Sequence, residues 1–247
     1  MGKVLALVVA VAVTLALATT ALANHRWAKY HWARTSNPFT VKLGDNLSTS
    51  WKTYLSEASG DWSLSSVLDT RVVAGGGSTC NPTNGRVEVC NGNFGDNGWL
   101  GIAQIWAWGT HITQGRVRVN DYYFNQSTYN TPAWRRLVMC QEVGHEFGLG
   151  HQDENFYNAN LGTCMDYSAD PDGPPSNEHP NQHDYDQLAS IYAHLDRSTT
   201  LASAPAELPG SAPPFSQASR ANGSLYVDDL GNGGRLITFV LWTPFGK

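Results

Sequence analysis

Residues 131–151 constrain the fold more than any other segment, because they predict a helix that has to be buried. Thr131 and Pro132 are typical of an N-cap and a first helical residue. The helix that follows has apolar residues on every side, and such a helix lies inside a protein. Gly148 can adopt the positive φ that ends a helix and turns the chain back. The rest of the chain therefore has to supply a core around this helix.

Other segments predict the strands and helices of that core. Alternating or apolar runs predict strands near residues 39–43, 65–74, 100–106 and 115–120. Apolar residues at helical spacing predict two further helices, over residues 51–58 and 182–195. Because 41% of the 247 residues are hydrophobic, the chain can bury a sizeable core. We predict one α+β domain over residues 24–197.

Both ends of the chain differ in composition from this domain. Residues 1–23 combine one basic residue, an apolar run and a small-residue cleavage site, which is typical of a secretion signal. An uncleaved membrane anchor is the alternative, because the apolar run is just long enough to span a bilayer. Residues 198–219 predict a Pro/Ala/Ser-rich linker, and residues 220–247 predict a C-terminal β-hairpin appendage. We expect a secreted, extracellular protein that contacts no membrane after signal cleavage.

Four cysteines, an even number in an exported chain, predict two disulfides. Three pairings are formally open. The pairing of sequence neighbours joins Cys80 to Cys90 and Cys140 to Cys164, and we favour it. A catalytic thiol at Cys140 is the competing interpretation, but two disulfides would use all four cysteines.

The predicted helix carries polar residues whose spacing suits a metal site. Gln141 and His145 are four residues apart and project from one helical face, and Glu142 lies on the same side as His145. A turn at Gly148 could bring His151 back to the same place. Two imidazoles beside a carboxylate are what a zinc site that activates water requires.

This pattern resembles the metzincin clan of zinc endopeptidases, whose motif is His-Glu-x-x-His-x-x-Gly-x-x-His. Four residues fall on the motif in register, namely Glu142, His145, Gly148 and His151. Residues 163–167, with the sequence TCMDY, are similar to the Met-turn of the clan. The likeness is closest to the matrixins, while a tyrosine two residues after the methionine is more like astacins and serralysins.

The resemblance covers roughly residues 36–197 and implies a fold. It implies a catalytic domain with a twisted, mostly parallel sheet, an antiparallel edge strand, a buried active-site helix and a C-terminal helix. Residues 100–104 would form the edge strand, on which Gly101, Ile102 and Ala103 would bind an extended peptide substrate. An ordinary interior strand is the alternative for this segment.

The resemblance also implies roles for single residues. His145 and His151 would bind zinc, and Glu142 would act as general base and then as general acid. Met165 would form a structural base beneath the metal. Tyr167 would bind the metal or stabilise the oxyanion, and a buried structural tyrosine is an equally good interpretation.

Gln141 departs from the motif, because the clan has its first zinc-binding histidine at this position. The oxygen of a glutamine amide is a weaker ligand for zinc than imidazole. Three possibilities stay open. Gln141 could be the third ligand through its oxygen, a water or another histidine (His111, His179 or His183) could complete the site, or the site could have lost its metal.

Two functions therefore stay open. The first is a secreted zinc endopeptidase that hydrolyses peptide bonds in a protein or peptide substrate. The second is a catalytically inactive metzincin-fold protein that binds peptides or extracellular matrix. A formal net charge of −5 excludes a strongly basic nucleic-acid binder, and we expect a monomer.

Two features outside the motif bear on this choice. Asp96, Asp170 and Asp172 lie in loops where calcium could bind, although solvated turns explain them equally well. The hairpin at residues 220–247 would pack on the catalytic domain, along its open edge.

Overall fold

The computed structural model describes residues 24–201 and 223–244. The predicted secretion signal and most of the predicted linker lie outside the described residues. Within the described part, no helix has the length and the apolar character that crossing a membrane requires.

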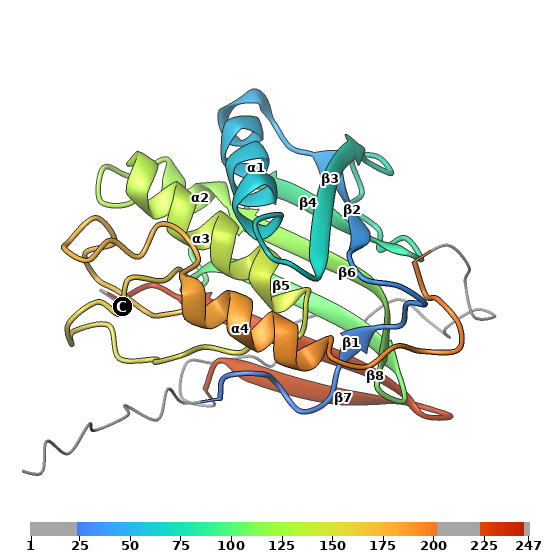
Figure 1. The fold of residues 1–247 in the computed structure, drawn as a ribbon. Helices are drawn as coiled ribbons and strands as arrows, with labels where there is room; N and C mark the ends of the chain where they lie inside the picture. The colour runs from blue at the N-terminus through green and yellow to red at the C-terminus, as the bar shows by residue number, and fades with distance from the viewer. Residues whose placement is uncertain (1–23, 202–222, 245–247) are drawn as a thin grey trace, which may run out of the picture.

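One eight-stranded sheet forms the framework (Figure 1). Its strands are β1 (His31–Trp32), β2 (Phe39–Asn46), β3 (Leu68–Ala74), β4 (Arg86–Gly92), β5 (Trp99–Trp108), β6 (His111–Asn120), β7 (Leu225–Gly231) and β8 (Gly234–Trp242). Seven of them follow the order β3-β2-β4-β6-β5-β8-β7, and the short β1 pairs with β6. Strands β1, β2, β3, β4 and β6 pair in parallel, while β5, β8 and β7 continue the sheet antiparallel. The predicted α+β class with a mostly parallel sheet is confirmed.

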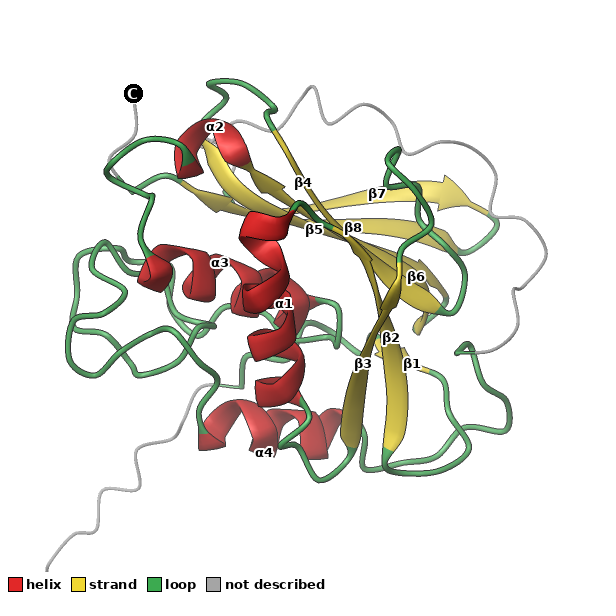
Figure 2. Cartoon of the chain, turned by 90° about the horizontal axis from the view of Figure 1, so that it is seen from above, coloured by secondary structure: helices red, strands yellow, loops and turns green. Residues whose placement is uncertain are grey.

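Three of the four helices cover one face of this sheet. The helices are α1 (Thr49–Trp62), α2 (Asp121–Phe124), α3 (Pro132–His145) and α4 (Gln182–Ile191). Figure 2 shows α1, α3 and α4 on the same side of the strands. Helix α3 begins as predicted, because the side chain of Thr131 accepts a hydrogen bond from the backbone N–H of Trp134 at 3.3 Å. Helix α4 ends at Ile191, before the predicted residue 195.

Strand β5 is antiparallel as predicted, but its predicted place at the edge of the sheet is wrong. Strand β8 pairs along its whole length, from Trp99 opposite Trp242 to Trp108 opposite Gly234. The reason lies in β8, which is buried on both faces from residue 236 onward. A strand that is apolar on both sides gains most when neighbours cover both of them. The C-terminal hairpin therefore packs along the open edge of the domain, as expected, and extends the sheet by two strands.

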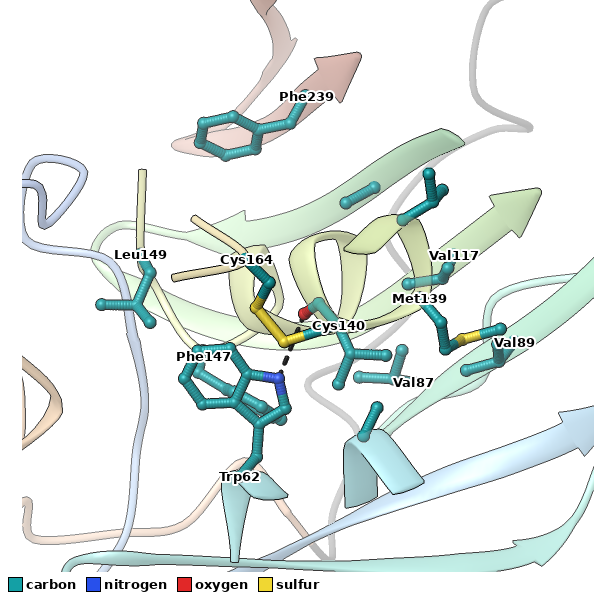
Figure 3. Packing of buried hydrophobic residues seen from close by; sticks show 14 of the residues in the cluster. Trp62, Val87, Val89, Val117, Met139, Cys140, Phe147, Leu149, Cys164 and Phe239 are labelled. Carbon is teal, nitrogen blue, oxygen red and sulfur yellow. Dashed lines mark hydrogen bonds between the residues drawn. A yellow bond between two sulfur atoms is a disulfide. The ribbon is translucent and has the colours of Figure 1, made fainter. Parts of the chain in front are cut away.

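Both predicted disulfides are present, joining Cys80 to Cys90 and Cys140 to Cys164. The second bridge lies inside the core, where the indole N–H of Trp62 donates to the carbonyl of Cys140 at 3.1 Å (Figure 3). It ties the middle of α3 to the segment that contains Met165. No free cysteine is found in the chain.

Candidate metal centre

The turn after α3 brings His151 back against the helix. Gly148 has a φ of +92°, and the carbonyl oxygen of Tyr30 lies where a Cβ at this position would project. Only glycine fits such a turn. As a result, the ring centroids of His145 and His151 are 4.5 Å apart. We call Gln141, His145 and His151 the inner centre.

The two imidazoles of the inner centre are held through Nδ1. His145 Nδ1 lies 2.9 Å from the carbonyl oxygen of Leu149, and His151 Nδ1 lies 2.9 Å from a carboxylate oxygen of Glu154. Both partners are acceptors, so each Nδ1 carries the proton and each Nε2 keeps its lone pair. Both Nε2 atoms are buried, and nothing among the described residues hydrogen-bonds to them. Histidines that bind metals have this arrangement.

Gln141, like the two histidines, is held by a hydrogen bond at one polar atom, while its other polar atom has no partner among the described residues. Its side chain is fully buried, and its amide nitrogen donates to the carbonyl of Cys164 at 2.7 Å. A carbonyl oxygen can only accept, so this bond fixes which end of the amide is the nitrogen. The other end, Oε1, is buried and has no hydrogen-bond partner in residues 24–201 or 223–244. A buried polar atom without a partner is costly, which points to a ligand at this position.

Glu142 is turned toward β5. A Cβ on Gly101 would lie 2.6 Å from Oε1 of Glu142, so the absence of a side chain on this strand makes room for the carboxylate. Burial raises the pKa of Glu142 well above its usual value, and the backbone N–H of Ala103 opposes this shift. Two of the residues predicted to bind substrate thus border the predicted general base.

Glu146 is a buried carboxylate that the sequence analysis missed. It lies one turn after Glu142 and packs against Gly115 of β6. Its Oε1 accepts the backbone N–H of Arg116 at 3.2 Å, and burial raises its pKa well above the usual value. A signal was present in the sequence, because Gly101 and Gly115 lie within or at the start of two predicted strands and leave room for two glutamates at helical spacing.

Met165 and Tyr167 both lie at the inner centre. The sulfur of Met165 would be 2.6 Å from a Cβ on Gly144, so the methionine packs directly beneath α3. The ring of Tyr167 lies 4.6 Å from that of His151. Its hydroxyl donates to the carbonyl of Val240 in β8 at 3.0 Å, and burial raises its pKa well above the usual value. In this structure the hydroxyl of Tyr167 is therefore engaged by the hairpin.

Strand β8 covers the inner centre. The ring of Phe239 stacks on His145 with a centroid distance of 4.0 Å and an angle of 4°, and it meets His151 edge-on at 5.7 Å. Glu154, which holds His151, also accepts a hydrogen bond from the hydroxyl of Ser224 at 2.6 Å. The sequence analysis had no signal for Phe239, since its position depends on the register between β8 and β5.

The three residues predicted to bind substrate pair with this strand. Gly101 lies opposite Leu241, Ile102 opposite Val240 and Ala103 opposite Phe239. Their backbone edge is therefore taken by the chain itself.

The N-terminal arm supports the turn that carries His151. The carbonyl of His25 accepts the backbone N–H of Gly150 at 2.5 Å, and Arg26 forms a β-bridge with Leu149. The His25 ring is buried with Nδ1 3.0 Å from the Gly150 carbonyl oxygen and Nε2 3.3 Å from Asp184.

The histidines considered as replacement ligands have other neighbours. His179 pairs with Asp61 at 2.8 Å, and His111 lies 3.3 Å from Asp196. The ring of His183 lies 4.9 Å from that of His25.

The predicted calcium sites are not gathered into a cluster of ligands. Asp96 accepts a hydrogen bond from the hydroxyl of Tyr123 at 2.9 Å. Over the described ranges, one group of three His, Cys, Asp or Glu side chains has its ligand atoms within 4.8 Å of one another, and it consists of His31, His194 and Asp196. Calcium binding stays a prediction.

Comparison with known proteins adds a loose structural likeness. No family model and no curated protein matches the sequence. A structure of myroilysin is similar to the chain with a TM-score of 0.38 and 15% sequence identity, over 66% of this chain and 96% of that chain. A second myroilysin structure has a TM-score of 0.37 and 14% identity, over 66% of this chain and 86% of the other. Because this likeness is weak, the function has to be inferred from the residues of the inner centre.

Proposed function

We propose that this chain is a secreted zinc-dependent endopeptidase of the metzincin type. The observation that carries the proposal is the set of three buried atoms at the inner centre: Gln141 Oε1, His145 Nε2 and His151 Nε2. None of them has a hydrogen-bond partner within the described part of the chain. One oxygen and two imidazole nitrogens are a donor set that zinc accepts, although nitrogen in place of the oxygen would bind more tightly.

The surrounding residues support this use of the site. When bound, zinc would lower the pKa of water and polarise the carbonyl of the scissile bond. Glu142 would take up a proton on its carboxylate and deliver it to the leaving amine. Its burial against Gly101 keeps bulk water away from the carboxylate. Tyr167 would donate to the developing oxyanion once its hydroxyl is released from Val240.

A second candidate function is peptide binding without cleavage. One observation favours it, namely the weak ligand Gln141, and a peptide would have to displace β8 before it could add to β5 as a strand. In this function the fold would hold an extended segment and no peptide bond would be broken.

Zinc content together with peptidase activity separates the two functions. We expect purified protein to hold a zinc ion that the Gln141→Met variant loses, because methionine has a similar size and lacks the oxygen. We also expect cleavage of denatured casein that chelators abolish, at a low rate in the wild-type chain because β8 covers the inner centre. The matched control is His179→Gln, which removes a histidine outside the centre. Full zinc occupancy in Gln141→Met, or cleavage that resists chelators, would contradict the proposal.

A further inference from the structure

A second group of histidines surrounds Asp196, far in sequence from the motif. They come from β1, from the start of β6 and from the segment after α4, and they are His31, His111 and His194. Their Nε2 atoms lie 3.5, 3.3 and 3.8 Å from Oδ1 of Asp196. The Nε2 atoms of His31 and His194 are 3.2 Å apart. We call His31, His194 and Asp196 the outer cluster.

The spacing in the outer cluster matches a tetrahedral metal site. Ligands about 2.0–2.1 Å from zinc, at the corners of a tetrahedron, are about 3.3–3.4 Å from one another. The three separations in the outer cluster are 3.2, 3.5 and 3.8 Å. A movement of a few tenths of an ångström would therefore place the three atoms around one ion.

The neighbours of the outer cluster orient its ligand atoms. His31 Nδ1 lies 2.7 Å from the carbonyl oxygen of Lys29, so Nδ1 carries the proton and Nε2 faces the cluster. The other carboxylate oxygen of Asp196, Oδ2, accepts from the side chain and the backbone of Arg34 at 2.9 and 3.2 Å. This leaves Oδ1 for the histidines. Metal ligands in proteins are held by such outer hydrogen bonds.

We propose that His31, His194 and Asp196 bind a zinc ion at a second, structural site. The fourth ligand would be a water or His111, whose Nε2 lies 3.3 Å from Oδ1 of Asp196 and whose side chain is 40% exposed. An ion can enter through a cavity of about 390 Å³ that His31 and His194 line. The ion would fasten the N-terminal arm to the end of the catalytic domain. Because the same arm supports the turn of His151, the outer site would stiffen the inner one.

Zinc titration of the full-length protein tests this site. We expect the wild-type chain to bind one zinc ion in addition to any ion at the inner centre. The His194→Gln variant should lose this additional ion. At a hundredfold excess of zinc over the Kd of the outer site, binding at that site should contribute about 5–10 °C to the rise in Tm of the wild-type apoprotein. A part of this rise should be lost in His194→Gln. The control is His179→Gln, since His179 is 52% exposed, His194 is 51% exposed, and both pair with an aspartate.

The outcome depends only on the outer cluster. Equal zinc stoichiometry in wild type and His194→Gln would overturn the proposal and leave a hydrogen-bonded network of imidazoles around Asp196. Failure of the inner centre to bind zinc would lower both stoichiometries by one and leave their difference unchanged.

A second inference comes from the hairpin and rests on the proposed function. Strand β8 lies on the edge of β5 where an extended peptide would add, and it buries Phe239 against the two zinc-binding histidines. The hydroxyls of Tyr167 and Tyr157 donate to the carbonyls of Val240 and Pro244 at 3.0 and 2.6 Å. These two hydrogen bonds hold the C-terminal part of β8 and the segment just after it.

We infer that the hairpin is an internal blocking strand that mimics a substrate. It keeps the peptidase latent until it is displaced. The preferred substrate would be an extended peptide with an aromatic side chain at the place of Phe239. Cleavage of the hairpin itself is disfavoured, because the ring of Phe239, and not a peptide bond, faces His145.

Two variants of the full chain test the blocking strand. Phe239→Ser should raise kcat/KM for an aromatic peptide at least tenfold, and Val227→Ser, a change at a half-exposed position of β7, should not. The double variant Tyr157→Phe with Ser224→Ala removes two hydrogen bonds that hold the segments flanking the hairpin, and we expect a smaller rise.

Peptide binding provides a readout that needs no catalysis. In a Glu142→Gln background, Phe239→Ser should tighten the binding of a fluorescent aromatic peptide at least tenfold. Unchanged binding in both the Phe239→Ser and the double variant would overturn the blocking role. If Phe239→Ser tightens peptide binding but the same variant with Glu142 intact cleaves no peptide, the blocking role of the hairpin would stand and the proposed peptidase activity would be overturned.

Discussion

The inner centre and the outer cluster use the same side chain in opposite surroundings. In the inner centre, Gln141 and His145 are fully buried and lie beneath β8. In the outer cluster, the side chain of His194 is 51% exposed and borders a cavity. The inner donors are all neutral, whereas the outer donors include the carboxylate of Asp196.

This difference in charge and access separates the two expected roles. If zinc binds the inner centre as proposed, three neutral donors would leave its full charge there, and the low dielectric would strengthen its effect on a substrate carbonyl. A carboxylate lowers the net charge of the outer site. An outer ion would therefore hold segments together, while an inner ion would act on substrate. The predictions below test this division of roles.

The largest expected effect is the loss of cleavage in Glu142→Gln. The change keeps the size of the side chain and removes its ability to take up a proton. We expect kcat/KM to fall by about 10²–10⁴-fold with zinc content unchanged. The measurement is peptide cleavage by the full chain, in the Phe239→Ser background as well. Cleavage that survives in Glu142→Gln would mean that the inner centre does not do the chemistry proposed for it.

The inner centre should also depend on its disulfide. The amide nitrogen of Gln141 donates a hydrogen bond to the carbonyl of Cys164. The disulfide to Cys140 holds Cys164 in place. Replacing both cysteines by alanine should lower the free energy of unfolding by about 3–4 kcal/mol, measured in urea, and should release the inner zinc. The control replaces Cys80 and Cys90 by alanine, which should cost about 2–3 kcal/mol and leave the zinc bound. Equal zinc loss in both would show a general effect of unfolding.

Zinc binding by the outer cluster should depend on the carboxylate of Asp196. Asp196→Asn keeps the shape of the side chain and removes the charge, so zinc should bind there about 10²-fold more weakly. Protons should compete with zinc, so that binding weakens as the pH falls and the histidines are protonated. Titration calorimetry measures both effects. The control is Asp61→Asn, which alters the partner of His179 outside both sites. Unchanged zinc binding in Asp196→Asn would show that the outer cluster is not a zinc site.

The two sites also differ in how far the sequence could predict them. His145, Gly148 and His151 lie within a few residues of one another, so helical geometry and one glycine turn are enough to bring the two rings together. The disulfide from Cys140 to Cys164 follows from an even count of cysteines and from proximity in the chain. These features are local, and periodicity and turn chemistry describe local features well.

The outer cluster and the cover over the inner centre depend on tertiary pairing. His31 meets Asp196 only because β1 lies beside β6 and the chain returns after α4. Phe239 meets His145 only in one register of β8 against β5. The hairpin was expected on the open edge of the domain, but the predicted edge position of residues 100–104 was wrong because the sequence does not show that these residues form the edge that the hairpin covers.

The smallest expected effect is a gain in zinc affinity when Gln141 becomes histidine. The imidazole would offer nitrogen in place of an amide oxygen, and we expect zinc to bind the inner centre about tenfold more tightly. The gain is limited because the hydrogen bond from the amide nitrogen of Gln141 to the carbonyl of Cys164 has to be remade by an imidazole of different shape at a fully buried position. Competition with a chromophoric chelator measures the affinity, with His194→Gln in the background so that the inner centre is read alone. A tighter inner site with higher peptidase activity would mean that Gln141 lowers occupancy. Tighter zinc binding without peptidase activity in the Phe239→Ser background would instead favour the peptide-binding function. In that function the inner centre would bind a peptide and its zinc ion would take no part in catalysis.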